Sequence, residues 1–171
     1  MYRAKDFQYM KVVNVKGKTL GYIKDVLIDF HNNLVKGFLV SSMNLFRKSQ
    51  QVLVEDIVAV DKMMIVNGFS NGTLFPFSEI RDLEVYSNRG MLIGVIEDLI
   101  IDRKNFEIKG ILISSGLIHK LIDGKSILIP GRCILAEDYI VHFDPDSKIK
   151  LYSMPHKKDG GNEIWELVLE E

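Results

Sequence analysis

The sequence contains one cysteine, four prolines and no long apolar run. Its single cysteine, Cys133, cannot form an intramolecular disulfide, and no Cys-x-x-Cys pair is present to bind zinc. A membrane-spanning helix needs roughly 20 consecutive apolar residues, and the N-terminal segment M-Y-R-A-K-D-F-Q-Y-M carries charges where a signal peptide needs an apolar core. We therefore expect no membrane span and a cytoplasmic location.

The chain also lacks a surplus of either charge. It has 22 Lys and Arg residues against 23 Asp and Glu residues, which gives a net charge of −1. Proteins that bind nucleic acid usually carry a basic surplus, so the overall charge does not favour that function. Hydrophobic residues make up 47% of the 171 residues and charged residues 26%, which is the composition of one folded domain or of two small ones.

The sequence has no glycine-rich phosphate-binding motif, and its histidines lack the spacing of a metal site. The segment H-F-D-P-D brings His142 near Asp144 and Asp146, but a Ca²⁺ loop needs more oxygen ligands, so we interpret D-P-D as a turn. Cys133 follows Arg132, which could lower the pKa of the thiol, but no base is identifiable for it. We interpret Cys133 as a small hydrophobic residue near a barrel wall, and we expect no metal, no cofactor and no catalytic residue.

Two segments of the chain are nearly identical: G-Y-I-K-D-V-L-I-D from Gly21 and G-V-I-E-D-L-I-I-D from Gly94. The shift that carries Gly21 onto Gly94 also holds without a gap from Ala4 to Ser42, which indicates an internal duplication. Further along, the apolar pattern predicts that the shift grows from 73 to 75 and 77, so the loop after the first hairpin is predicted to be two residues longer in the second repeat. The shift of 75 pairs Val52–Val54 with Ile127–Ile129 and Ile65–Val66 with Ile140–Val141, and the shift of 77 pairs Ile57 with Ile134.

Each repeat carries two aspartates four positions apart, Asp25 and Asp29 in the first and Asp98 and Asp102 in the second. Two residues at this spacing on a strand share a face but lie roughly 13 Å apart, too far to share a metal ion or a proton. Asp29 and Asp102 stand at the start of turns, where aspartate bonds to the local backbone. We interpret Asp25 and Asp98 as acceptors for backbone donors at a bend of the barrel.

Short strands separated by turns are predicted in each repeat. In the first repeat they span residues 20–30, 34–41, 51–54 and 63–66, with one helical turn at 55–57. No segment has the periodicity of a long helix, so we expect an all-β protein built from two small barrels. The repeats are predicted to span residues 1–72 and 73–153, followed by a strand-like tail, residues 154–171, that docks at a sheet edge.

The two repeats resemble the PRC-barrel family. The first reads G-K-T-L-G-Y-I-K-D-V-L-I-D, then V-K-G-F-L-V and V-L-V-E-D-I, and the second reads R-G-M-L-I-G-V-I-E-D-L-I-I-D, then I-K-G-I-L-I and S-I-L-I-P-G-R-C-I. The family includes the cytoplasmic domain of the photosynthetic reaction-centre H subunit and the C-terminal barrel of a bacterial ribosome-maturation factor. The resemblance covers residues 4–66 and 77–143 and implies a tandem bacterial protein that binds partners and has no catalytic residues. The family's proline after the third strand is Pro130 in the second repeat, whereas Glu55 takes this place in the first.

Two loops and the tail are the candidate partner-binding segments. Loops 43–51 and 116–126 each place an apolar pair beside basic residues, which either marks a contact surface or closes the open end of a barrel. The only tryptophan lies in the tail and is a candidate anchor. The candidate residues are Leu45, Phe46, Arg47, Lys48, Leu117, Ile118, His119, Lys120 and Trp165.

These features predict a non-enzymatic cytoplasmic adaptor that binds another protein or a larger assembly, because no nucleophile, base and oxyanion donor stand together. Homodimer formation is compatible with the same features. The alternative is an assembly factor associated with RNA or the ribosome, and an enzyme or a small-ligand barrel comes last. RNA association would use Arg47, Lys48, Lys120, Lys125 and Arg132.

Overall fold

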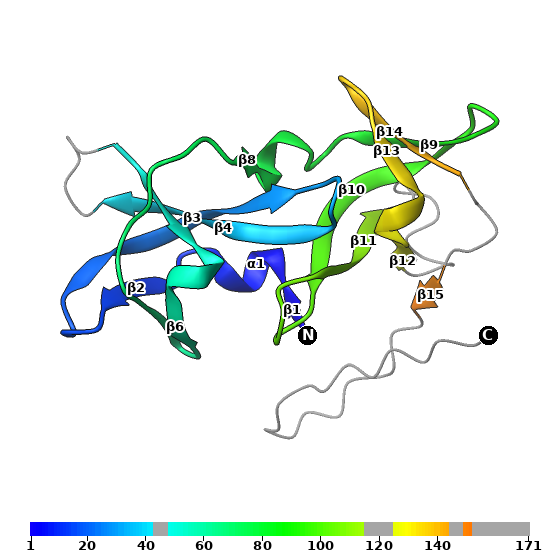
Figure 1. Ribbon diagram of the computed structural model, residues 1–171. Helices are drawn as coiled ribbons and strands as arrows, with labels where there is room; N and C mark the ends of the chain where they lie inside the picture. Colours follow the sequence, from blue (N-terminus) through cyan, green and yellow to red (C-terminus); the bar gives the residue numbers. More distant parts are fainter. Residues whose placement is uncertain (43–47, 115–124, 144–148, 152–171) are drawn as a thin grey trace.

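In the computed structural model, which describes residues 1–42, 48–114, 125–143 and 149–151, each repeat forms one strongly curved sheet (Figure 1). The sheet of the first repeat has the strand order β5-β4-β3-β2-β7-β6, and β8 adds to one end of β3. Its strands are β2 (Lys11–Asn14), β3 (Thr19–Asp29), β4 (Leu34–Ser42), β5 (Gln50–Leu53), β6 (Ile57–Val60), β7 (Met63–Val66) and β8 (Phe75–Pro76).

The sheet of the second repeat has the matching order β13-β14-β9-β10-β11-β12-β15, and β1 adds to one end of β10. Helical structure in the described part of the chain is limited to α1 (Ala4–Phe7) and three 3₁₀ turns, Val54–Asp56, Phe77–Glu79 and Pro130–Arg132. The predicted all-β fold of two tandem barrels with short helical turns is therefore confirmed. The strands are β1 (Tyr2–Arg3), β9 (Glu84–Ser87), β10 (Leu92–Ile101), β11 (Ile108–Ser114), β12 (Lys125–Leu128), β13 (Cys133–Leu135), β14 (Tyr139–His142) and β15 (Ile149–Leu151).

The central hairpin of each repeat is held by an aspartate at its turn. The backbone N–H of Asn32 donates to Asp29 Oδ1 at 3.0 Å, and that of Lys104 donates to Asp102 Oδ1 at 2.7 Å. Hydrogen bonds from Asn32, led by its side chain, lower the pKa of Asp29, and the Lys104 backbone bond lowers the pKa of Asp102. The predicted turn role of both aspartates is confirmed.

The strand register corrects the predicted alignment of the two repeats. Lys11 of β2 pairs with Met63, and Glu84 of β9, the equivalent of Lys11, pairs with Tyr139. Tyr139 lies 76 positions after Met63, so the predicted shift of 75 at this strand is wrong. A slip of one residue would exchange the inner and outer faces of a strand, and the corrected shift aligns two fully buried residues, Met64 and Ile140.

The shift of 76 also holds at the third strand. Val52 pairs with Phe38, and Leu128 pairs with Ile111, the equivalent of Phe38. The second loop is therefore three residues longer than the first, not two. Val54 rather than Glu55 matches Pro130, since each begins a 3₁₀ turn.

A β-bulge in β6 lowers the shift between the repeats from 76 at Ile57 to 75 at Ala59. Ile57 pairs with Val66 and Ala59 with Ile65, so Val58 is an extra residue in this strand. The equivalent of Ile57 is therefore Cys133, which pairs with His142, and the predicted match with Ile134 is wrong. Strand β6 itself was missed by the sequence prediction, which placed only a helical turn before β7.

The two repeats exchange their N-terminal segments. Strand β1 of the first repeat pairs with β10 of the second, with Tyr2 opposite Ile101. Strand β8, which is the equivalent of β1 in the second repeat, pairs with β3 of the first, with Phe75 opposite Ile28. Figure 1 shows β1 beside the end of β10 and β8 beside β3. Each short N-terminal strand therefore completes the sheet of the opposite repeat.

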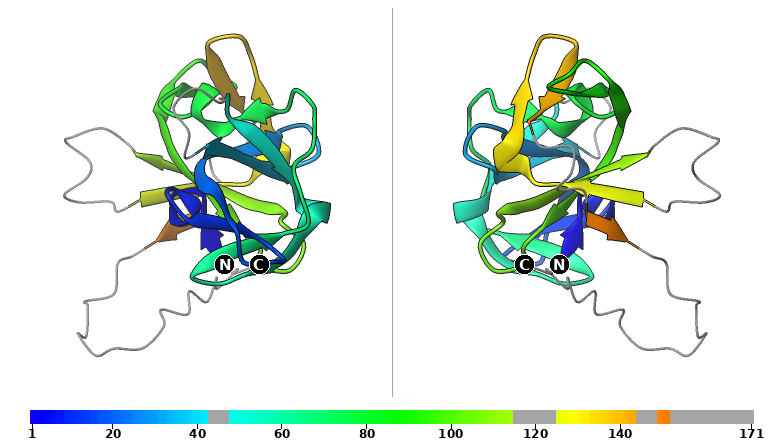
Figure 2. Two further views of the ribbon diagram at one scale, coloured as in Figure 1. Left: turned by 90° about the vertical axis from the view of Figure 1, so that its left-hand side faces the viewer. Right: turned by 90° about the vertical axis from the view of Figure 1, so that its right-hand side faces the viewer.

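One hydrophobic core runs through both repeats. Phe7 lies against Phe38 with their ring centroids 4.8 Å apart, and Phe38 lies 6.0 Å from Phe106 of the second repeat. All three rings belong to a single cluster of buried residues drawn from both sheets. Seen along the long axis, one repeat stands in front of the other (Figure 2). The shared core gives each small barrel more buried apolar surface than it would have alone.

Candidate interaction surface

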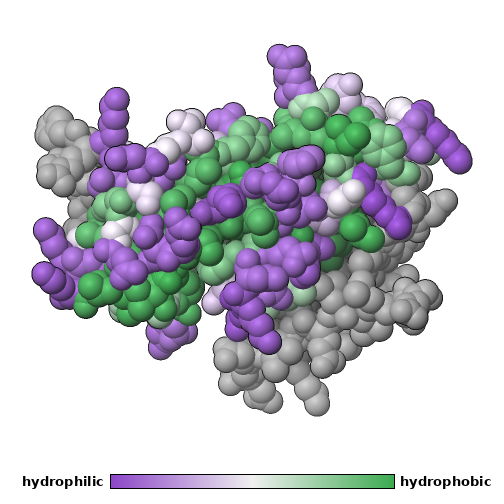
Figure 3. Space-filling model, viewed as in Figure 1, coloured by the Kyte–Doolittle hydropathy of each residue, from purple (hydrophilic) through white to green (hydrophobic). Residues whose placement is uncertain are grey.

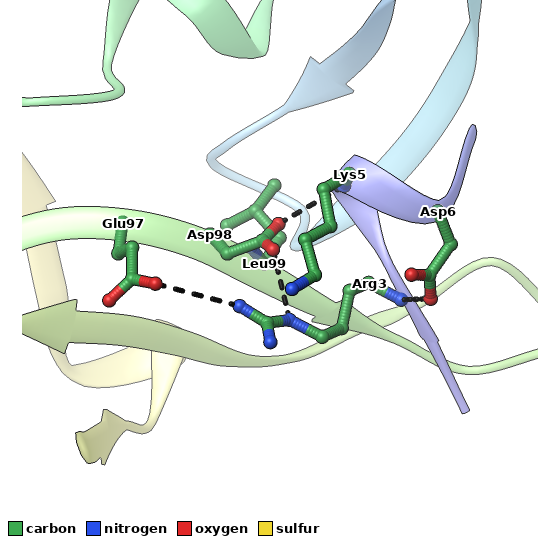
Figure 4. A network of polar contacts seen from close by, with 6 residues as sticks. All are labelled: Arg3, Lys5, Asp6, Glu97, Asp98 and Leu99. Atoms are coloured by element: carbon green, nitrogen blue, oxygen red, sulfur yellow. Dashed lines mark hydrogen bonds and ion pairs between the residues drawn. The ribbon is translucent and has the colours of Figure 1, made fainter. Parts of the chain in front are cut away.

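A polar network at the junction of the repeats holds the N-terminal segment against β10 (Figure 4). Asp98 is 3% exposed, and its Oδ2 accepts a hydrogen bond of 2.9 Å from Arg3 Nε. Asp98 Oδ1 accepts from the backbone N–H groups of Leu99 at 2.9 Å and Lys5 at 3.3 Å. The carboxylate therefore has charge-assisted and backbone partners together, and its role is to anchor α1 and β1.

Asp25 of the first repeat has the equivalent role toward the helical turn of the second repeat. Its Oδ1 accepts from the backbone N–H of Val26 at 2.8 Å, and its Oδ2 accepts from that of Ser78 at 3.2 Å. Ser78 is the equivalent of Lys5 in the second repeat, so each aspartate binds the helical turn of the other repeat. Both aspartates follow a β-bulge in their strands. The interpretation of Asp25 and Asp98 as acceptors for backbone donors at a bend is confirmed.

A shallow pocket of about 280 Å³ lies between these two helical turns. Its charged lining includes Lys5, Lys24 and Arg81 together with Asp25 and Asp98. Both aspartates are already occupied by backbone donors, so they are poorly placed to act on a substrate. Among the described residues, no group of three His, Cys, Asp or Glu side chains could hold a metal ion.

Cys133 and His142 lie side by side on paired strands of the second barrel. The Cys133 Sγ lies 3.6 Å from the carbonyl oxygen of Ile129 and packs against the core. Burial raises the pKa of the Cys133 thiol from 9.0 to about 12, so it stays protonated and unreactive near neutral pH. The interpretation of Cys133 as a small hydrophobic residue is confirmed. His142 is fully buried, while Asp144 and Asp146 lie outside the described residues.

Most of the candidate residues in the loops and the tail lie outside the described part of the chain. Lys48 is described and is exposed, and Arg132 is exposed at the end of its 3₁₀ turn. The remaining partner-binding candidates therefore stay predictions. They are Leu45, Phe46, Arg47, Leu117, Ile118, His119, Lys120 and Trp165.

The outer face of the second sheet carries a row of apolar side chains across four strands. On the solvated face of a sheet, outward positions are normally polar. Here the register places four apolar residues in one row across β13, β14, β9 and β10, and Ile134 and Leu92 at its ends are 56% and 55% exposed. The four residues of the row are Ile134, Val141, Tyr86 and Leu92.

Two aromatic residues extend the row on either side. Tyr139 precedes Val141 by two positions and meets Tyr86 edge to face at a centroid distance of 5.8 Å. Tyr86 Oη donates to Glu84 Oε2 at 2.6 Å, and this hydrogen bond raises the pKa of Tyr86, so the phenol stays neutral. Phe143, two positions after Val141, is 49% exposed. We name the set Tyr86, Leu92, Ile134, Tyr139, Val141 and Phe143 the second-repeat face.

The first repeat provides an internal reference for this surface. With the corrected register, Thr19 takes the place of Leu92, Asn67 that of Phe143 and Ala59 that of Ile134. The same fold thus accepts smaller or polar residues at these positions, so the barrel does not need the larger apolar ones. In Figure 3, hydrophobic residues gather at the upper right of the molecule, where Figure 1 places β9, β13 and β14.

Strand β14 carries a sequence signal for this surface. Strand β14 reads Y-I-V-H, in which inward Ile140 and His142 alternate with outward Tyr139 and Val141. When the residues that point to both faces of a strand are apolar, the strand is either buried on both sides or has a contact surface on its solvent side. The predicted shift of 75 aligned Ile140 with Ile65, whereas the register aligns it with Met64.

The tandem barrels, their exchanged N-terminal strands and an exposed apolar sheet face define a class of small, duplicated β-barrel protein. A comparison with protein families matches the PRC-barrel domain over residues 1–70 and again over residues 72–149, so the chain belongs to the PRC-barrel family. The comparison with individually curated proteins found no match. Domains of this family typically serve in protein interaction or assembly and are generally non-catalytic. The described residues include no helix that could span a bilayer.

Proposed function

We propose that this chain is a non-enzymatic, cytoplasmic PRC-barrel module that binds protein through the second-repeat face. The observation that carries the proposal is the difference between the copies: the second presents Leu92, Ile134 and Phe143 where the first has threonine, alanine and asparagine. Exposed apolar clusters with aromatic members are typical of protein contact surfaces. We also propose that residues 1–72 and 73–153 form the two repeats and that residues 154–171 form a tail.

A variant that restores the first-repeat residues tests this proposal. Leu92→Thr, Ile134→Ala and Phe143→Asn together remove apolar surface without introducing a residue that the fold has not already accepted. We expect the variant to fold normally and to lose protein partners that the native chain captures from its own cell extract. A matched control is Val15→Asn, which removes a 58% exposed apolar side chain from the first repeat. If the variant and the native chain recover the same partners, this surface is not the binding site.

The loop and tail candidates are proposed as additional contacts. The pair Leu45→Asp and Phe46→Asp tests the first loop, and Trp165→Ala tests the tail. Loss of partners in these variants with no loss in the face variant would move the binding site from the sheet to these segments.

A further inference from the structure

The charges around the second-repeat face are separated along the strands. Strands β9 and β14 are parallel, and Glu84 pairs with Tyr139 at their common start. The exposed carboxylates of Glu137 and Asp138 immediately precede Tyr139, so this end of the face is acidic. Arg89 lies in the turn after β9, at the opposite end of the face. It is five positions after Glu84, which at about 3.3 Å per residue corresponds to roughly 16 Å.

A second basic residue belongs to the same end as Arg89. The carbonyl oxygen of Arg132 accepts a hydrogen bond of 3.0 Å from the backbone N–H of Phe143, which follows β14. The face therefore has an acidic end, an apolar middle and a basic end. Such a pattern is complementary to itself when it is turned end for end.

We propose that a second copy of this chain occupies the second-repeat face and forms a two-fold symmetric dimer with the strands of the two copies antiparallel. The inference rests on the proposed function and names the partner at the same surface. Two sheet faces can meet around a two-fold axis that lies in the plane of contact. If the axis ran along the strands, Glu84, Glu137 and Asp138 would meet their own copies. An axis perpendicular to the strands keeps each strand over itself and reverses its ends. Glu84 then faces Arg89 of the other copy, and the turn that carries Glu137 and Asp138 faces Arg132. The charges therefore select this arrangement.

The size of the surface indicates a weak dimer. Four strands at about 4.8 Å spacing and about six residues at 3.3 Å give roughly 400 Å² of flat sheet. A standard interface buries about 800 Å² on each partner, so this contact belongs to the weak class. We expect a concentration-dependent dimer with a dissociation constant in the micromolar range.

Charge reversal on the full chain tests both the dimer and its orientation. Sedimentation velocity from about 10 to about 500 μM should show the dimer, and Arg89→Glu should raise its dissociation constant about tenfold. Glu84→Lys, which introduces the residue that the first repeat has at the equivalent position, should do the same. Combining the two changes should restore the native dissociation constant to within about threefold, because the opposite charges again face each other. Lys16→Glu, at the equivalent turn of the first repeat, is the matched control and should leave association unchanged.

Several results would overturn this proposal. A chain that is monomeric at about 500 μM has no such dimer, and a double variant that fails to recover association has a different orientation. Benzoylphenylalanine at position 143, exposed at the edge of the face, then identifies the occupant by photo-crosslinking in its native cell. A cross-link to the same face of a second copy supports the dimer. A cross-link to the chain's own tail overturns it, and a cross-link to another protein overturns it but leaves the proposed function standing.

Discussion

Leu34 and Glu107 occupy equivalent positions in the two repeats and form an antiparallel bridge with each other. The bonds around them are reciprocal: the N–H of Val35 donates to Phe106 at 2.9 Å, and the N–H of Ile108 donates to Asn33 at 2.7 Å. Only a two-fold rotation brings equivalent residues face to face in this way. The repeats are therefore related by a pseudo-two-fold axis between Leu34 and Glu107, which also explains the exchange of β1 and β8 between the sheets.

Replacing Asp98 with asparagine should weaken the junction of the repeats. Asp98 is almost fully buried and accepts from Arg3 and two backbone N–H groups, so Asp98→Asn should lower the free energy of unfolding by about 1–3 kcal/mol in urea titrations. The control is Lys109→Ala, which breaks an exposed ion pair with Glu107 and should leave the free energy of unfolding almost unchanged. Equal effects of the two changes would contradict an anchoring role for Asp98.

The shared core predicts that both repeats unfold together. Phe106 of the second repeat contacts Phe7 and Phe38 of the first, so thermal and urea unfolding should each give one cooperative transition. Phe106→Ala should reduce the free energy of unfolding by about 3–5 kcal/mol and keep the transition single. Phe143→Ala, at a half-exposed phenylalanine, should cost less than about 1 kcal/mol and serves as the control. Two separate transitions in the native chain would show that the barrels are independent.

The repeated glycines Gly21 and Gly94 should not tolerate a side chain. A Cβ at Gly94 would lie 2.7 Å from the carbonyl oxygen of Ser114, and at Gly21 it would approach that of Ser41 even more closely. Alanine at either site should therefore lower the free energy of unfolding by more than about 2 kcal/mol, with the larger loss at Gly21. Gly68→Ala is the control, because no atom lies within 4 Å of its added Cβ. A Gly21→Ala variant as stable as the control would disprove the close strand approach.

Cys133 should react slowly with alkylating reagents. Burial raises the pKa of its thiol from 9.0 to about 12, so at pH 8.5 iodoacetamide should modify the folded chain at least about 100-fold more slowly than the urea-unfolded chain. Because the folded pKa is the higher one, the stabilisation from this group is complete below about pH 9 and is lost as the pH rises toward about 12. Cys133→Ala should remove this part of the alkaline destabilisation. Similar alkylation rates in the folded and unfolded chains would contradict the burial of the thiol.

The sequence predicted the duplicated barrels because strand and turn signals are local. The β-branched and apolar residues from Gly21 to Asp29 and the aspartates at both turns act through backbone sterics and short-range hydrogen bonds. The second copy of the pattern supports the interpretation of the first. The register after the first loop was not predictable in the same way. A β-bulge at Val58 adds one residue without changing the apolar character of the strand, so the apolar pattern does not show that Ala59, rather than Ile57, is the equivalent of Ile134.

The sequence alone determined the family, the all-β class and the structural role of the repeated aspartates, since each depends on residues close together in the chain. Only the tertiary structure decided how the repeats fit together and which side chains reach solvent. The bond from Arg3 to Asp98 joins residues 95 positions apart, and the row from Ile134 to Leu92 joins four strands in an order that differs from the chain order. Long-range pairing of this kind depends on the packing of the whole core, which a local pattern of apolar residues permits but does not specify.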